Sequence, residues 1–157
     1  MQNIKHLIIA PHPDDDIIGC SQIFLNNSLS DIVVIYVETP PNLDELPYRT
    51  KLALNNDLKH LTSDECWNLY NQALNIYVPD PFYDYHPWHR AIGGFGLYLS
   101  NCGYNVWFYT TRMNTPYVKE VPDPEKKKRT LDLLYPYKSD LWKYDARFYL
   151  FEGITKY

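Results

Sequence analysis

The sequence predicts an α/β domain with a mostly parallel sheet, because short apolar runs alternate along the chain with segments of helical periodicity. The clearest strand covers residues 31–38 (DIVVIYVE), a continuous β-branched run typical of a strand buried on both faces. Histidine-rich loops also follow two of the predicted strands. Because ligand-binding loops gather at the carboxyl ends of parallel strands, we expect these loops to lie near a functional site.

The first half of the chain supplies two strands and two helices in this interpretation. Residues 6–10 (HLIIA) form a short apolar run that ends at Pro11, which predicts a buried strand. Residues 17–25 carry apolar side chains at helical spacing behind three aspartates, which favours a helix. After the strand at 31–38, residues 49–61 again have apolar positions that fit a helix.

The middle of the chain continues the alternation. Residues 75–78 (NIYV) are predicted as a strand that ends at Pro79. Residues 89–99 are predicted as a helix that Gly103 would cap, and residues 105–110 (NVWFYT) as the next strand.

The C-terminal part is less regular. Residues 125–135 predict an amphipathic helix that ends before Pro136, whereas residues 141–151 fit a helix or a strand. Residues 126–129 (KKKR) are interpreted as a solvated face of the first of these segments, since acidic residues flank them.

Length and composition limit the class of protein. The 157 residues predict a single domain over residues 1–157, and the net charge of −4 argues against nucleic acid as a general partner. The longest apolar run is far shorter than the roughly 20 residues that a membrane-spanning helix needs. Three cysteines without a CxxC pair, and an N-terminus without a signal-peptide pattern, predict a cytoplasmic protein.

The first loop with candidate chemistry is residues 10–16 (APHPDDD), which follow a predicted strand. One imidazole and three carboxylates lie within five positions, and a divalent cation explains this crowding better than the partial charge of a helix N-terminus. Adjacent side chains diverge, so we expect one of Asp14 and Asp15 to ligate the metal while the other faces substrate. In the alternative interpretation, one of these two aspartates merely caps the helix.

The second loop is residues 83–90 (YDYHPWHR), where His86 and His89 are three positions apart and can face one site. A His/Asp pair from one strand end and a histidine from another would leave an open position for water, as in a catalytic zinc site. Either loop alone has an ordinary structural explanation, and only the two together predict a metal site. His6 and His60 are assigned to structure.

Both loops resemble the signatures of the PIG-L/LmbE family of zinc-dependent N-deacetylases. Residues 10–15 match its [AP]HPDDE stretch, with Asp16 in place of the glutamate, and residues 86–91 (HPWHRA) match its HPDHRA stretch except at Trp88. Lys127 or Lys128, followed by Tyr137 and Ser139-Asp140, is similar to the family's K…Y.SQ tail. The resemblance implies a Rossmann-like three-layer LmbE-like domain that removes the acetyl group from an N-acetylated amino sugar or glycoside of the N-acetylglucosamine type.

The resemblance also assigns roles to individual residues. It implies Zn²⁺ as the cofactor, although another divalent transition metal would fit the same ligands. The metal ligands would be His12, Asp15 and His89. Asp14 would be the general base, and His86 would stabilise the oxyanion.

The resemblance matches Arg49 to an arginine of the family, which implies a substrate contact. The chain is short for the family, so we expect an open pocket where Tyr85 and Trp88 line the entrance and stack on a sugar ring or a base. Trp88 stands where the family has an aspartate that tunes its neighbouring histidine. We therefore expect a lower pKa for His86 unless Asp84 takes over that role.

Two alternatives to a sugar deacetylase remain from the sequence. The same chemistry could act on a modified nucleotide or nucleic acid, as a virus or mobile element would use it. The chain could also be a non-catalytic sugar-binding module, but a pure binder has no need of a base at Asp14.

Overall fold

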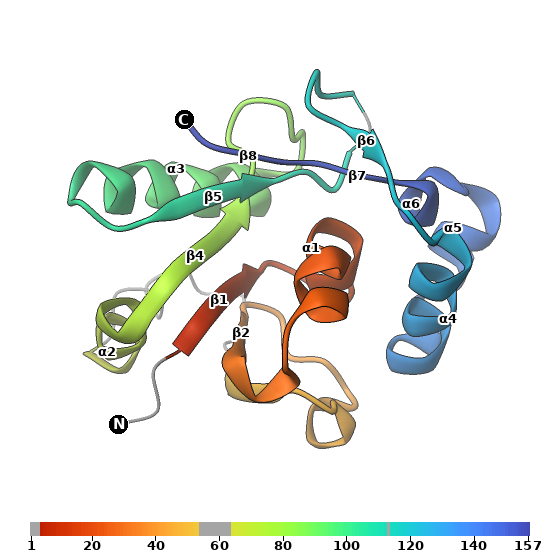
Figure 1. The fold of residues 1–157 in the computed structure, drawn as a ribbon, viewed down its shortest axis with the longest axis horizontal. Coiled ribbons are helices and arrows are strands. Elements are labelled where there is room, and N and C mark those ends of the chain that lie inside the picture. Colours follow the sequence, from red (N-terminus) through yellow and green to blue (C-terminus); the bar gives the residue numbers. More distant parts are fainter. Residues whose placement is uncertain (1–3, 54–63, 113) are drawn as a thin grey trace.

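The structure is a computed structural model that describes residues 4–53, 64–112 and 114–157. A six-stranded sheet lies between helices on its two faces (Figure 1), in the order β3-β2-β1-β4-β5-β8. The first five of these strands pair in parallel, and β8 runs antiparallel to β5. The strands of the sheet are β1 (Ile4–Ala10), β2 (Ile32–Tyr36), β3 (Arg49–Ala53), β4 (Ala73–Pro79), β5 (Val106–Tyr109) and β8 (Ile154–Thr155).

Two apolar cores cover the two faces of the sheet, and they explain why its strands are apolar without alternation. In β1, Leu7 and Ile9 point into one core, while Ile8 and Ala10 point into the other. The first core contains α2 (Asp64–Gln72) and α3 (Pro87–Asn101), and the second contains α1 (Asp15–Asn26), α4 (Pro124–Leu134) and α5 (Asp140–Tyr144). The predicted α/β class with a mostly parallel sheet is therefore confirmed.

The remaining elements are short and lie outside the parallel sheet. After α6 (Arg147–Leu150), β7 (Phe151–Glu152) pairs with β6 (Lys119–Glu120), and the chain then continues as β8 along the sheet edge beside β5 (Figure 1). Three single turns of 3₁₀ helix complete the described chain: η1 (Leu29–Asp31), η2 (Leu43–Glu45) and η4 (Pro136–Lys138). None of the described helices is long and apolar enough to cross a bilayer.

The sheet order places β1 at a topological switch point. Its neighbours β2 and β4 lie on opposite sides of it, so the crossovers diverge at the carboxyl end of β1. In open α/β sheets this is where ligands bind. The first loop leaves β1 here, and the second loop runs from β4 to α3, so both candidate loops reach the same edge.

Most predicted elements are confirmed, with ends that shift by a few residues, but the helix predicted at 49–61 is wrong where it can be compared. Residues 49–53 form β3 beside β2, because ladder hydrogen bonds along the sheet edge outweigh a weak helical pattern. Residues 54–61 lie outside the described residues. Both alternatives for 141–151 occur, since α5 and α6 are helical and β7 is a strand.

The solvated face predicted for residues 126–129 is wrong at Lys127, whose side chain is fully buried. A helix turns about 100° per residue, so one of four consecutive side chains on α4 points inward. Its ammonium group donates hydrogen bonds to the carbonyls of Ile18 (2.6 Å) and Phe151 (3.1 Å), and to Oε2 of Glu152 (2.9 Å). All three donors of this buried charge therefore have partners.

Candidate metal and catalytic site

The first loop turns into α1 through a strained residue. Asp14 has φ 86° and ψ −26°, and it is the one non-glycine residue with positive φ in the described chain. Such a left-handed conformation costs on the order of 1–3 kcal/mol for a residue with a side chain. Asp14 occupies the N-cap position of α1, but its side chain makes no capping bond, contrary to the structural alternative.

Three donor atoms from the two loops form a small triangle, here called the donor triangle. Nδ1 of His12 lies 3.0 Å from Nε2 of His89 and 3.2 Å from Oδ2 of Asp15. Nε2 of His89 also lies 3.2 Å from this oxygen. A tetrahedral zinc ion with bonds of about 2.0–2.1 Å separates its ligand atoms by about 3.3 Å. The spacing of the donor triangle therefore fits such an ion.

His86 lies beside the donor triangle. Together with His12 and His89 it offers ring nitrogens that all lie within 4.8 Å of one another, so the three imidazoles could also hold a metal. Its ring centroid is 4.5 Å from that of His12 and 5.1 Å from that of His89. Nδ1 of His86 accepts a hydrogen bond from the backbone N–H of Trp88 (3.2 Å), which caps α3.

A carboxylate orients the buried His89 from behind. Nδ1 of this ring lies 2.7 Å from Oδ2 of Asp84, which also accepts a hydrogen bond from the hydroxyl of Thr111 (2.9 Å). Carboxylates in this position hold a metal-binding histidine in one tautomer and increase its basicity. Asp84 accepts a hydrogen bond from the backbone N–H of His86 (3.0 Å), whereas its hydrogen bond to an imidazole is the one with His89. On the ring of His86 its charge raises the pKa but is outweighed by burial and the neighbouring histidines.

Burial and neighbouring charges separate the pKa values of the adjacent aspartates. Burial, and then the charge of Asp15, raises the pKa of Asp14 to about 9. Burial alone would also raise the pKa of Asp15, but the charge of His89 and hydrogen bonds from His12 and His89 hold it well below its usual range.

The two histidines of the second loop also have pKa values shifted in opposite directions. Burial would lower the pKa of His89, but the charge and hydrogen bonds of Asp15 and Asp84 outweigh it and raise that pKa to about 10. Burial and the charges of His12 and His89 lower the pKa of His86, in the direction expected from the sequence.

The carboxylate of Asp14 has an oxygen, Oδ2, to which nothing in the described chain bonds. The residue is 2% exposed, and this buried oxygen has no hydrogen-bond partner there. A buried polar atom without a partner is costly, on the order of 1–3 kcal/mol, and requires an explanation. A reacting group or an ion that enters the pocket would supply the missing partner.

A pocket of about 140 Å³ opens over these groups. It brings together five of the sequence-predicted site residues, which are His12, Asp14, Asp15, His86 and His89. Its remaining walls come from the following residues that the sequence analysis did not single out as site residues: Ile18, Thr111, Arg112, Lys138, Leu141 and Phe148. Of these, Thr111 and Arg112 follow the predicted strand 105–110, so the carboxyl-end rule could have found them.

The three predicted substrate contacts are separated in the structure. Tyr85 is 77% exposed and lines an adjoining pocket. Trp88 instead packs against the core on the α2 and α3 side of the sheet. Arg49 begins β3, and its buried Nη1 has no hydrogen-bond partner among the described residues. Neither Arg49 nor Trp88 lines the pocket over the donor triangle.

Beneath the site, a cluster of tyrosines fixes the start of α1. Oδ2 of Asp16 accepts hydrogen bonds from the hydroxyls of Tyr36 (2.6 Å), Tyr48 (2.5 Å) and Tyr135 (2.6 Å). Asp16 is fully buried, and burial raises its pKa although these three hydroxyls oppose the shift. The position with aspartate in place of the family's glutamate thus anchors the helix and does not line the pocket.

Comparison with solved structures places this arrangement in a known fold. The N,N'-diacetylchitobiose deacetylase from Pyrococcus horikoshii, solved with an inhibitor, matches with a TM-score of 0.63 over 98% of this chain and 84% of that chain. The chain has the LmbE-like deacetylase fold. The conserved protein TT1542 from Thermus thermophilus matches with a TM-score of 0.61, over 98% of this chain and 94% of TT1542.

Sequence identity to these two proteins is low, at 19% and 14%. No protein-family model matches the sequence, and no curated protein matches it. The structural likeness therefore establishes the LmbE-like fold, and the activity must be argued from the site.

Proposed function

We propose that this protein is a metal-dependent hydrolase that removes the acetyl group from the amine of an N-acetylated sugar or glycoconjugate of the N-acetylglucosamine type. The proposal depends above all on the donor triangle, with sides of 3.0–3.2 Å, next to the unpartnered carboxylate of Asp14. The substrate class is supported by the structural neighbour, which is a deacetylase of N,N'-diacetylchitobiose.

His12, Asp15 and His89 would hold the metal. Two imidazoles and one carboxylate suit Zn²⁺, although another divalent transition metal would fit the same donors. Such an ion would supply Lewis-acid chemistry, polarising the acetamide carbonyl and making the attacking water more acidic.

His86 could reach a metal, but its hydrogen bonding favours a different role. Its Nδ1 accepts the N–H of Trp88, so the neutral ring carries its proton on Nε2. This Nε2–H is a hydrogen-bond donor, and we assign it to the oxyanion that develops on the acetamide oxygen. A lowered pKa favours this neutral ring.

Asp14 has the properties of the general base. Its carboxylate is buried, lines the pocket and has an unpartnered oxygen among the described residues. A cation held by the donor triangle would lower the raised pKa of Asp14, so that the ionised form could accept a proton from the attacking water. The same carboxyl group then returns the proton to the amine nitrogen as the C–N bond breaks. The products are acetate and the free amino sugar.

The test combines metal content with acetate release. Wild type and His89→Ala are purified in parallel without chelator, and each is analysed for bound metal and for acetate released from N-acetylglucosamine and N,N'-diacetylchitobiose. We expect about one metal per wild-type chain, as in a mononuclear catalytic site, and its loss together with activity in the variant. A wild type that binds no metal even after reconstitution would overturn the proposal.

The second candidate is the same hydrolysis on an acetylated nucleotide. The observation that favours it is the cationic side chain of Arg112 in the pocket wall, which would suit a phosphate. Acetate release from acetylated nucleotides under the same conditions, without release from the sugars, would decide for this candidate.

A further inference from the structure

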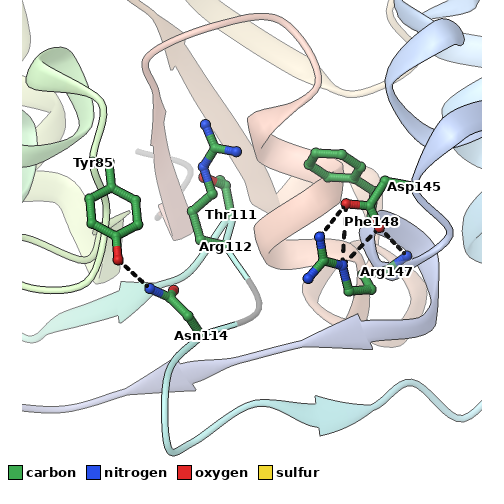
Figure 2. A pocket seen from close by; sticks show the side chains of 7 residues that line it. All are labelled: Tyr85, Thr111, Arg112, Asn114, Asp145, Arg147 and Phe148. Carbon is green, nitrogen blue, oxygen red and sulfur yellow. Dashed lines mark hydrogen bonds and ion pairs between the residues drawn. The ribbon is translucent and has the colours of Figure 1, made fainter.

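A second pocket of about 240 Å³ adjoins the one over the donor triangle (Figure 2). The two share Thr111, Arg112 and Phe148, so these residues form a common wall. The other residues that line the adjoining pocket are Tyr85, Asn114, Asp145 and Arg147. A substrate whose acetamide reaches Asp14 would extend its remaining part past this wall.

The charges in the adjoining pocket are unequal. Nη2 of Arg147 lies 2.7 Å from Oδ2 of Asp145, and Nε of Arg147 lies 2.9 Å from Oδ1, so these two side chains neutralise each other. Figure 2 draws Arg112 between this pair and Tyr85, with its guanidinium group joined to none of them. Within the described residues, no carboxylate forms an ion pair with Arg112. The pocket therefore has one excess positive charge.

The backbone under Arg112 is held in place. The hydroxyl of the buried Thr110 donates a hydrogen bond to the carbonyl of Arg112 and accepts one from its N–H (3.0 Å). The N–H of Thr110 in turn bonds to the carbonyl of Gly153 (3.0 Å). A cation on an anchored backbone loses less entropy when it binds an anion than one on a free loop.

We propose that the adjoining pocket binds an anionic group, a phosphate or a carboxylate, on the amine-bearing part of the substrate, with Arg112 as its main ligand. The guanidinium group matches either anion with two parallel hydrogen bonds. Asp145 stays paired with Arg147, which limits its repulsion of the anion. Tyr85 and Phe148 supply aromatic surface for a sugar ring. This inference rests on the proposed function, because it places the anion and the acetamide on one molecule.

The activity arm compares anionic and neutral substrates. The probes are N-acetylglucosamine 1-phosphate, N-acetylglucosamine 6-phosphate, the carboxylate-bearing N-acetylmuramic acid and the neutral methyl N-acetylglucosaminide. We expect kcat/KM for at least one anionic probe to exceed that for the neutral probe by about 10-fold or more, since a charge-assisted hydrogen bond contributes on that scale. Which probe is preferred distinguishes phosphate from carboxylate.

Arg112→Gln should lower kcat/KM about 10-fold more for the preferred anionic probe than for the neutral one. The matched control is Arg129→Gln, because Arg129 is an exposed arginine on α4 that lines neither pocket, and it should leave both rates unchanged. Equal losses on the two probes in Arg112→Gln would overturn the inference.

A binding arm separates failure of the inference from failure of the proposed function. Glucosamine 6-phosphate and glucosamine 1-phosphate lack the acetyl group, so their affinity can be measured calorimetrically without turnover. Binding that depends on Arg112, with no acetate released from any probe, would support the anion site and overturn the deacetylase. Acetate release without an anionic preference or Arg112-dependent binding would do the reverse.

Discussion

Two buried ionic clusters contact α1, and they differ in how completely their hydrogen bonds are satisfied. In the first, Lys127 donates to three acceptors, and Glu152 accepts from Lys127, from the hydroxyl of Ser21 and from the backbone N–H of Gln22. In the second, the donor triangle brings ring nitrogens and a carboxylate to within 3.2 Å, and Asp14 beside it has an unpartnered oxygen in the described structure.

We interpret this difference as one between a structural cluster and the proposed functional site. Removing a buried ion pair from water is costly, and full hydrogen bonding offsets that cost in the Lys127–Glu152 cluster. The Asp14 region retains two costs, a left-handed backbone and an unpaired buried oxygen. Strained backbone and unpaired buried atoms are characteristic of sites where a ligand supplies the missing interactions.

Asp14→Asn should break the functional cluster and leave the fold intact. Asparagine adopts the left-handed backbone readily and has nearly the same shape, but it cannot accept the proton of the attacking water. We expect kcat to fall about 10²–10⁴-fold, the range for loss of a general base, with metal content and melting temperature retained. Single-turnover acetate release gives the rate, and activity within a few-fold of wild type would contradict the assigned role.

Lys127→Met should instead break the structural cluster. It leaves Glu152 buried without its cation, which should lower the free energy of unfolding by about 3–5 kcal/mol. Urea denaturation measures the change. Lys126→Met is the matched control, because this neighbour is exposed and its loss should cost no more than about 0.5 kcal/mol. Equal effects at the two positions would show that the cluster does not stabilise the fold.

Asp84→Asn tests the carboxylate that orients His89. The neutral amide makes a weaker acceptor for Nδ1, so metal affinity should fall about 10–100-fold. Competition with a chromophoric chelator measures the affinity. Thr111→Val removes only the hydroxyl that supports Asp84 and should have a smaller effect. Unchanged metal affinity in Asp84→Asn would separate this carboxylate from the metal site.

Tyr135→Phe should have the smallest effect, because Asp16 keeps the hydroxyls of Tyr36 and Tyr48. We expect a loss of about 1 kcal/mol in unfolding free energy. In the folded protein the pKa of Asp16 already lies above its unfolded value of about 4, and loss of the Tyr135 hydroxyl raises it further. The loss of unfolding free energy in the variant should therefore grow as the pH rises past the folded pKa of the wild type. Denaturation curves at several pH values would reveal a pH-independent deficit if Asp16 stayed protonated throughout.

The strands and the first loop are the features that the sequence predicts most clearly. Continuous β-branched runs such as 31–38 have few alternatives to a buried strand, and crowded charge at 12–16 implies a binding site wherever the fold places it. By contrast, residues 49–53 form a strand only because β2 offers them a ladder, which no local pattern reveals. Lys127 was equally hidden, because its partner Glu152 is 25 positions away.

Spacing along the chain does not predict which side chains of the site form hydrogen bonds with one another. Asp84 lies close to both His86 and His89 along the chain, and only the backbone path shows that its carboxylate meets His89. Trp88 is aromatic and lies between the two histidines, yet α3 turns it into the core on the other side of the sheet. Leu141 and Phe148 wall the pocket because α5 and α6 pack beside it. The irregular pattern of residues 141–151 does not predict this packing.

The separation of the donors along the chain sets an order of assembly during synthesis. His12 and His89 are 77 positions apart, so the first loop alone offers a passing ion only one imidazole and its neighbouring carboxylates. The donor triangle can form only after α3, which packs on β4 and β5, has left the ribosome. Lys138, Leu141 and Phe148, which wall the pocket, emerge later still. The proposed ion-binding groups therefore leave the ribosome before three of the residues that wall the pocket over them.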